Sequence, residues 1–299
     1  MIDGEPTKGS IYRLEGKLNF INQVDHYNRL RQHEKLNPKY HLKKDAIKNG
    51  QAKQRRYLHS SRERTFSEFL FYRHFYGNTL PTVLTEGKTD NIYLKAAIHQ
   101  LAQDYPELAS IKKDKSEYKL LLNFLNYNER TKYLLELYSG SDYLKDFVIH
   151  YKQNYNIYKA LKPSNPVIIF VDNDTGPKDL INYVNKIADI KLYPSSSKDI
   201  RSASFVHIFN NLYLIVTPMA KGSTTTDIEF FFKDTDRLRA YKGKAFNTVA
   251  NRNPELNLSK EAFATHIVHA QKNVIDFTNF KPLLDRIKKV IRHYNKIKK

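Results

Sequence analysis

Pro81-Thr-Val-Leu-Thr-Glu86-Gly87-Lys88-Thr89-Asp90 joins an apolar run directly to acidic residues, and Val167-Ile-Ile-Phe-Val-Asp172-Asn173-Asp174 repeats this arrangement further along the chain. Short apolar runs that end abruptly in polar residues are typical of buried strands. In open α/β sheets, ligands bind outside the carboxyl ends of the strands. We therefore expect two neighbouring strands that bring Glu86, Asp172 and Asp174 close together.

Three carboxylates in one place repel one another unless a cation lies between them, and Mg²⁺ or Mn²⁺ is a usual partner for such oxygen ligands. Gly87 permits a tight turn after Glu86, and Thr89 or Asp90 can cap the helix that follows. The alternative is that the residues after Val171 form an Asx turn and that Glu86 is an ordinary surface acid. Because the two motifs occur together, we favour the metal site.

The two motifs, Glu86-Gly-x-x-Asp90 and Asp172-x-Asp174, resemble the Toprim domain. This metal-binding fold is shared by type IA and type II topoisomerases, bacterial primases and overcoming-lysogenization-defect (OLD) nucleases. The resemblance implies an α/β fold with a Toprim-like (Rossmann-like), mostly parallel sheet. It also implies that Glu86 is the acid or base nearest the metal, and that Asp90, Asp172 and Asp174 belong to the metal site.

A third apolar run, 212–216, leads to a segment that contains Lys221, Asp227 and Glu229. This segment resembles the late part of the Toprim domain of OLD nucleases, where an acid ahead of a helix completes the site. The resemblance implies that Glu229 is an outer metal ligand or positions a water, with Asp227 as its rival. Asp227 could instead be a helix N-cap. Lys221 is a candidate partner for the reacting phosphate, or an ordinary solvated loop lysine.

The net charge is the strongest signal in the composition. The 299 residues carry a formal net charge of +19 and include no cysteine. A basic excess of this size favours nucleic acid as a partner, and a chain without cysteine has no disulfides, thiolate zinc site or thiol nucleophile. No apolar run reaches the ~18–20 residues of a membrane helix, and we identify no signal peptide. We expect a cytoplasmic, bacterial protein without a membrane partner.

Near the N-terminus, the segment Glu15-Gly-Lys-Leu-Asn-Phe-Ile-Asn-Gln-Val24 resembles the palm–thumb junction of bacterial reverse transcriptases of the retron and group II intron lineage. The polymerase motif Tyr-x-Asp-Asp is absent from the sequence, so the chain is not a polymerase by itself. The resemblance implies the C-terminal part of a retron-type reverse transcriptase–Toprim fusion, or of a split version, that acts in antiphage defence. The implied partners are the retron's RNA–DNA hybrid molecule, a DNA or RNA substrate, a separate ATPase, and a reverse transcriptase polymerase domain or chain.

Basic residues recur before residue 75, and residues 1–80 contain 16 Lys and Arg against 8 Asp and Glu. Such a segment, interleaved with tyrosines, favours a surface that follows phosphates and stacks on bases. The alternative is a solvated linker around Asn49-Gly50. The aromatic residues of 66–76 recur at helical spacing and predict core packing. The candidate nucleic-acid-binding residues are Arg29, Arg31, Lys43, Lys44, Arg55, Arg56, Arg62 and Arg64.

These patterns predict three parts of the chain. They are a basic, mainly helical, thumb-like nucleic-acid-binding segment (1–78), a Toprim-like domain (79–278) and a basic amphipathic C-terminal helix (279–299). Within the second part, residues from about 104 to 162 are expected to be a helical insertion, with helices at 120–125 and 133–138. The C-terminal helix either docks on the protein or clamps nucleic acid.

The expected activity is Mg²⁺- or Mn²⁺-dependent hydrolysis of phosphodiester bonds, because an acidic metal site within a basic shell suits that chemistry. A topoisomerase would also need an attacking tyrosine on a separate helix-turn-helix domain, and a primase would need a nucleotide-handling domain; the sequence indicates neither. The alternative from another class is a non-catalytic scaffold that holds the RNA–DNA molecule and docks a partner in a reverse transcriptase complex. Metal binding between Glu86 and Asp172 would distinguish the two.

Overall fold

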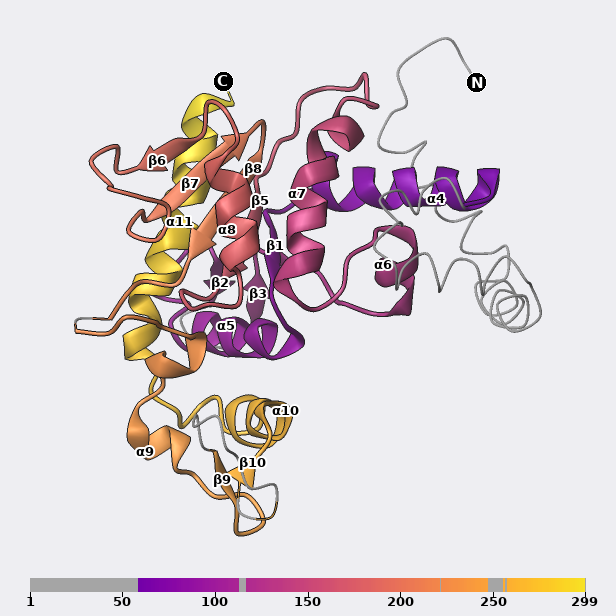
Figure 1. Cartoon of the computed structure of the whole chain (residues 1–299). Helices are drawn as coiled ribbons and strands as arrows, with labels where there is room; N and C mark the ends of the chain where they lie inside the picture. The colour runs from indigo at the N-terminus through magenta and orange to yellow at the C-terminus, as the bar shows by residue number, and fades with distance from the viewer. Residues whose placement is uncertain (1–58, 113–116, 221, 247–254, 256, 299) are drawn as a thin grey trace.

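The computed structural model of the chain describes residues 59–112, 117–220, 222–246, 255 and 257–298. Within these ranges the protein is a mixed α/β fold with a mostly parallel central sheet and helices on both of its faces (Figure 1). The α/β class predicted from the sequence is therefore confirmed. None of the helices in these ranges is long and apolar enough to cross a membrane.

The central sheet has six strands in the order β4-β1-β5-β8-β7-β6. They are β1 (Thr82–Thr85), β4 (Asn123–Phe124), β5 (Val167–Val171), β6 (Lys191–Tyr193), β7 (Phe205–Phe209) and β8 (Leu212–Val216). The first four in that order run parallel, and β7 and β6 add an antiparallel edge. Every residue of β1, β5 and β8 is buried, as expected of strands covered on both faces.

Helices form a layer on each side of this sheet. The longer ones are α4 (Ser61–Phe71), which continues into the π-helical turn η2 (Tyr72–Tyr76), α5 (Lys88–Gln100), α7 (Ser141–Tyr155), α8 (Lys178–Asn185) and α11 (Lys281–Ile297). Ile168 and Phe170 of β5 pack in one core with α5 and α11. The other three residues of β5 pack in a second core with η2, α7 and α8. This division follows the two-residue period of a strand and gives three layers.

The segment predicted to be helical at residues 120–125 forms strands instead. Its first residue ends β3 (Tyr118–Leu120), which pairs with β2 (Ala109–Ile111), and Phe124 of β4 pairs with Val83 of β1 in parallel register. A short apolar run does not distinguish a helix from a buried strand by its period, which explains the error. The helix expected at 133–138 lies earlier, as α6 (Glu129–Leu134). The chain from about 104 to 162 is therefore only partly helical.

Helix α7 belongs to the body of the fold. Its Leu144, Phe147 and Tyr151 are buried in the same core as strand β5. The segment before the expected boundary at residue 78 also enters this core, through Phe71 and Phe75. The aromatic residues before the first strand thus form core, as their spacing predicted.

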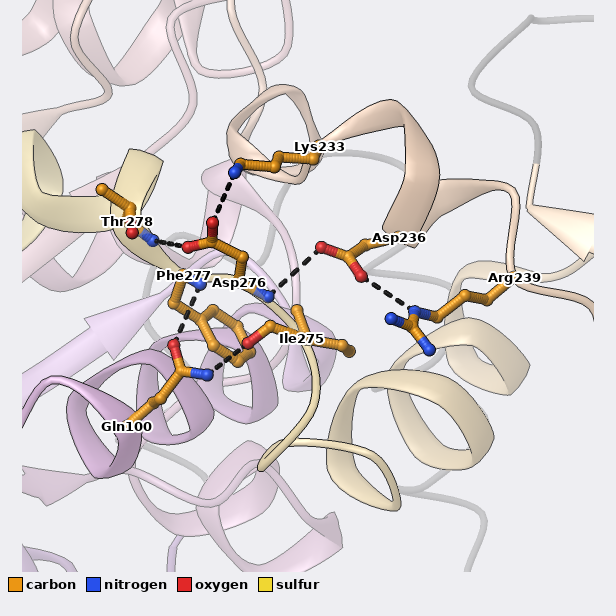
Figure 2. Close-up of polar contacts among 8 residues, drawn as sticks. All are labelled: Gln100, Lys233, Asp236, Arg239, Ile275, Asp276, Phe277 and Thr278. Atoms are coloured by element: carbon orange, nitrogen blue, oxygen red, sulfur yellow. Dashed lines mark hydrogen bonds and ion pairs between the residues drawn. The ribbon is translucent and has the colours of Figure 1, made fainter.

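The chain after β8 forms a series of short elements before α11. They are η3 (Ile228–Phe231), α9 (Asp234–Arg237), β9 (Ala245–Phe246), β10 (Asn257–Leu258), α10 (Lys260–Ala262), η4 (Phe263–His269) and η5 (Thr278–Phe280). Figure 2 shows the polar contacts that tie this region to α5. Asp236 pairs with Arg239 at 2.8 Å and accepts from the N–H of Asp276 at 3.2 Å. Gln100 of α5 accepts from the N–H of Phe277 at 3.1 Å. These contacts help to hold the segment that carries α10 beside α5.

Candidate functional site

Glu86 and Asp172 each follow a strand at the carboxyl end of the parallel sheet. Strands β1 and β5 are neighbours, with Thr85 opposite Phe170 in the last pair of their register. The N–H of Asp172 donates to Glu86 Oε1 at 3.0 Å. The structure therefore brings these two acids together, because parallel neighbours end at the same edge of the sheet.

The turn after β1 is held from several sides. The Thr85 hydroxyl donates to the Gly87 carbonyl at 2.8 Å, and the Tyr127 hydroxyl donates to the Thr85 carbonyl at 2.5 Å. Asp90 accepts from the Gly87 N–H at 2.9 Å, so Asp90 is one of the groups that cap α5. The N–H of Gly140, ahead of α7, donates to the Glu86 carbonyl at 2.7 Å. These contacts fix the backbone that presents Glu86.

Asn173 anchors the second turn and was not singled out in the sequence. Its side chain is fully buried, and its Nδ2 donates to the Thr217 carbonyl at 3.1 Å. Arg201 donates to Asn173 Oδ1 at 2.8 Å, and the backbone of Asn173 pairs with that of Thr226. The side-chain amide of Asn173 thus links the end of β5 to that of β8, and its backbone links β5 to the segment before η3. An amide between two acids at a strand end is the signal that could have identified it.

Asp174 follows the Asx-turn alternative in part. Its Oδ1 accepts from the Gly176 N–H at 2.8 Å, which closes a tight turn. A Cβ at Gly176 would lie 3.1 Å from Asp174 Oδ1 and 3.8 Å from Glu86 Oε2. A side chain at this position would therefore crowd the Asp174 carboxylate and lie in ordinary contact with that of Glu86.

Asp227 and Glu229 lie at the start of η3, whose Ile228 N–H donates to Asp172. Asp227 is the N-cap of η3 and accepts from the Phe230 N–H at 3.0 Å, which agrees with the helix N-cap that was one of the two expectations for Asp227. Glu229 is fully buried and pairs with Lys260 of α10, whose Nζ lies 2.9 Å from Oε1 and 3.0 Å from Oε2. Sequence reasoning missed Lys260, because nothing local marks the partner of an acid so far along the chain.

Six acids are close enough to influence one another, and we call them the acidic cluster: Glu86, Asp90, Asp172, Asp174, Asp227 and Glu229. Burial raises the pKa of Glu86 to about 7, and the charges of Asp90 and Asp174 add to this effect. Burial, and then the charge of Glu229, raises the pKa of Asp90 to about 6. The pKa of Asp172 lies well above its ordinary value, again chiefly through burial. A cation bound among these groups would favour their ionised forms.

Burial lowers the pKa of Lys260, but the charges of Glu229, Asp227 and Asp172 outweigh burial and leave that pKa raised. The pKa of Glu229 is itself raised, first by burial and against the pull of Lys260. The two shifts have different causes: neighbouring negative charge raises the pKa of Lys260, whereas burial raises that of Glu229. Lys260 therefore stays protonated and offsets only part of the cluster's charge.

The donor set of the acidic cluster fits Mg²⁺ or Mn²⁺, which bind carboxylate oxygens. Asp172 Oδ1 accepts from the Ile228 N–H at 2.9 Å, whereas Asp172 Oδ2 and Glu86 Oε2 accept no hydrogen bond from the described residues. Glu86, Asp172 and Asp174 are the residues that would hold the ion. As placed, however, no three acidic or histidine side chains within the described ranges are arranged to hold one ion together.

Several residues predicted to act in metal or nucleic-acid binding are not part of the acidic cluster. Arg62 and Arg64 are exposed on α4. The other candidates lie outside the described residues: Lys221, Arg29, Arg31, Lys43, Lys44, Arg55 and Arg56, with the whole segment 15–24. Their roles stay predictions.

No protein family matches the chain, and no solved structure matches it. What the site does must therefore be argued from its own chemistry.

Proposed function

We propose that the chain is a Mg²⁺- or Mn²⁺-dependent nuclease that hydrolyses phosphodiester bonds in DNA or RNA. One observation carries the proposal: Glu86 and Asp172 follow adjacent parallel strands and are joined by the 3.0 Å hydrogen bond between Asp172 N–H and Glu86 Oε1. Burying several acids together is costly for a protein that only has to fold. A cation that binds them removes that cost, and the net charge of +19 supplies attraction for a polyanion.

Each group has a role in this proposal. When bound, the metal ion supplies a lower pKa for a coordinated water and stabilises charge on the phosphate. Asp172 and Asp174 bind the ion. Glu86, whose pKa burial raises to about 7, can accept or release a proton near neutral pH. Lys260, ion-paired with Glu229, offsets part of the negative charge of the acidic cluster.

The finer fold and the biological context belong to the same proposal. The strand order around β1 and β5 and the two acidic turns support a Toprim-like domain of the OLD type. We further propose a retron-type reverse transcriptase as the setting, with an RNA–DNA hybrid molecule and a separate ATPase as partners and antiphage defence as the outcome. That setting rests on the resemblance of residues 15–24.

A non-catalytic scaffold is the second candidate, and one observation favours it. Within the described residues Asp90, Asp174 and Asp172 each accept a hydrogen bond from a backbone N–H, and no three acids are placed as ligands of one ion. A scaffold that holds an RNA–DNA molecule and docks a partner needs nothing more from these groups.

Single substitutions separate the two candidates. Glu86→Gln keeps an oxygen that can accept from Asp172 N–H, and Asp172→Asn keeps one for Ile228 N–H. For a nuclease we expect either change to abolish Mg²⁺- or Mn²⁺-dependent cleavage of labelled DNA and RNA, with nucleic-acid affinity nearly unchanged. Asp146→Asn, at an exposed position on α7, is the matched control and should cleave normally. Full cleavage, or full antiphage protection in cells, by a folded Glu86→Gln, Asp172→Asn double variant would contradict the proposal.

A further inference from the structure

The ring of Tyr138 is shared by two lysines. Lys132 Nζ of α6 lies 4.8 Å from the centre of the ring, and Lys88 Nζ of α5 lies 5.9 Å from it. Tyr138 is only partly buried, and Tyr143 meets its ring edge-on at 6.1 Å. The structure therefore presents a half-buried aromatic ring with two ammonium groups over it.

This group lies next to the acidic cluster. Lys88 comes two residues after Glu86. The segment that follows Tyr138 touches both acid-bearing turns, since Gly140 N–H donates to the Glu86 carbonyl at 2.7 Å and the Ser141 hydroxyl donates to the Gly176 carbonyl at 3.0 Å. Tyr138 is thus held within a few residues of contacts to both turns.

Lys88 and Lys132 offer positive charge beside the acidic cluster. Phosphates approaching several carboxylates are repelled unless cations stand at the rim. Lys260 is engaged by Glu229, and Lys145 by Asp142. In contrast, neither Lys88 nor Lys132 has a carboxylate within ion-pair distance among the described residues. Their ammonium groups are available to an incoming anion.

We propose that Tyr138, Lys88 and Lys132 form a subsite for single-stranded nucleic acid beside the acidic cluster. In the bound state the two ammonium groups move from the ring to the phosphates, and the Tyr138 ring stacks on the unpaired base between them. A ring together with cations suits this ligand, because every base has a face to stack and the backbone is charged at each step. The choice of nucleic acid rests on the proposed function, whereas the binding itself does not require cleavage.

Binding measured without catalysis tests this inference. The probes are short single-stranded DNA and RNA oligonucleotides that contain 2-aminopurine, whose fluorescence falls when the base stacks, mixed with the full chain in EDTA. We expect Tyr138→Ala to weaken affinity roughly ten-fold or more and to remove the fluorescence change. Tyr138→Phe, which keeps the ring, should retain both. Replacing Lys88 and Lys132 together by Gln should reduce the slope of log affinity against log salt by about 1.4.

The matched control is Lys298→Gln. Lys298 Nζ also lies beside a tyrosine ring, 5.9 Å from that of Tyr294, and donates to the Ser164 carbonyl. Ser164 precedes β5, so this pair lies toward the opposite edge of the sheet from the acids, and its loss should leave the oligonucleotide slope unchanged. Thermal unfolding of each variant checks that the chain remains folded.

The outcomes separate this inference from the nuclease proposal. Binding that depends on Tyr138 together with full cleavage by Glu86→Gln would leave the subsite and remove the metal-dependent nuclease. Cleavage that depends on Glu86, with affinity and fluorescence unchanged in Tyr138→Ala, would do the reverse. Failure of the chain to bind any single-stranded probe, or equal effects of Lys298→Gln and the Lys88, Lys132 double change, would overturn the subsite.

Discussion

Replacing Glu86 by Gln should stabilise the metal-free protein, by an amount that grows as the pH rises. Burial raises the pKa of Glu86 from its ordinary 4.5 to about 7. Between these two values the folded protein holds a proton that the unfolded chain has already released, so the contribution of Glu86 to stability falls as pH increases. At about 1.4 kcal/mol for each pH unit, the loss approaches 3 kcal/mol by neutral pH. Gln carries no charge and escapes this loss.

The useful quantity is the difference between the two proteins, because other groups titrate in the same range with the opposite sign. Burial lowers the pKa of His74 to about 4, so His74 makes the fold more stable as pH rises toward its ordinary 6.5. His74 is present in both proteins and drops out of the difference. We expect the melting temperature of Glu86→Gln to match that of the wild type near pH 4.5. At pH 7.5 the melting temperature of Glu86→Gln should exceed that of the wild type by about 6–12 °C in EDTA, since 1 kcal/mol shifts a domain of this size by roughly 2–4 °C.

Mg²⁺ completes the test. It competes with protons for the same oxygens, so it should raise the wild-type melting temperature at pH 7.5 and have little effect at pH 4.5. The gain should be absent in Glu86→Gln and retained in Asp146→Asn, the exposed control on α7. Scanning fluorimetry at several pH values measures all of this. A difference between wild type and Glu86→Gln that does not change with pH would refute the reasoning.

Two further predictions follow from the cluster and from the N-terminal segment. Lys260→Met removes the cation from fully buried Glu229, so it should destabilise the protein at pH 7.5 by about 1–2 kcal/mol, and lowering the pH should reverse much of this because Glu229 then takes a proton. Urea unfolding measures the change, and equal losses at pH 5 and pH 7.5 would contradict it. Deleting residues 1–58, which spares Phe71 and Phe75 in the core, should weaken binding to structured RNA or RNA–DNA duplex and flatten its salt dependence. Unchanged affinity in electrophoretic shift assays would remove the nucleic-acid role of that segment.

The sequence predicted the elements whose pattern is local and strong. Strands β1, β5 and β8 are continuous apolar runs, and α5 and α11 carry apolar residues at helical spacing, so each could be recognised alone. Strand β4 could not be recognised alone, because its two residues form a strand only by pairing with β1. Phe124 makes this pairing with Val83 at the edge of the sheet. Helix α7 has a local pattern of its own, yet it was missed in the sequence. Its buried Leu144, Phe147 and Tyr151 have the spacing of a core helix, but the polar residues between them obscured it.

The candidate site divides in the same way. Glu86 and Asp172 could be paired from the sequence because each ends a recognisable strand. Lys260 could not be assigned to Glu229, since their contact depends on how the short elements after β8 fold back, and Figure 2 shows that this path is fixed by polar contacts between distant residues. Asn173 holds the ends of two strands together through bonds to Thr217 and Arg201 that no local pattern announces.

The place of helix α11 at the end of the described chain has a consequence for synthesis in the cell. This helix covers one face of the central sheet, where it packs against Ile168, Phe170 and Tyr213. Because α11 follows every strand of the sheet in the chain, the part of this face that α11 covers stays exposed until the helix has been made, while α5 and the η4 segment cover the rest. An uncovered apolar sheet is prone to aggregate. Transcripts cut short within α11 should therefore yield protein that chaperones retain or proteases remove.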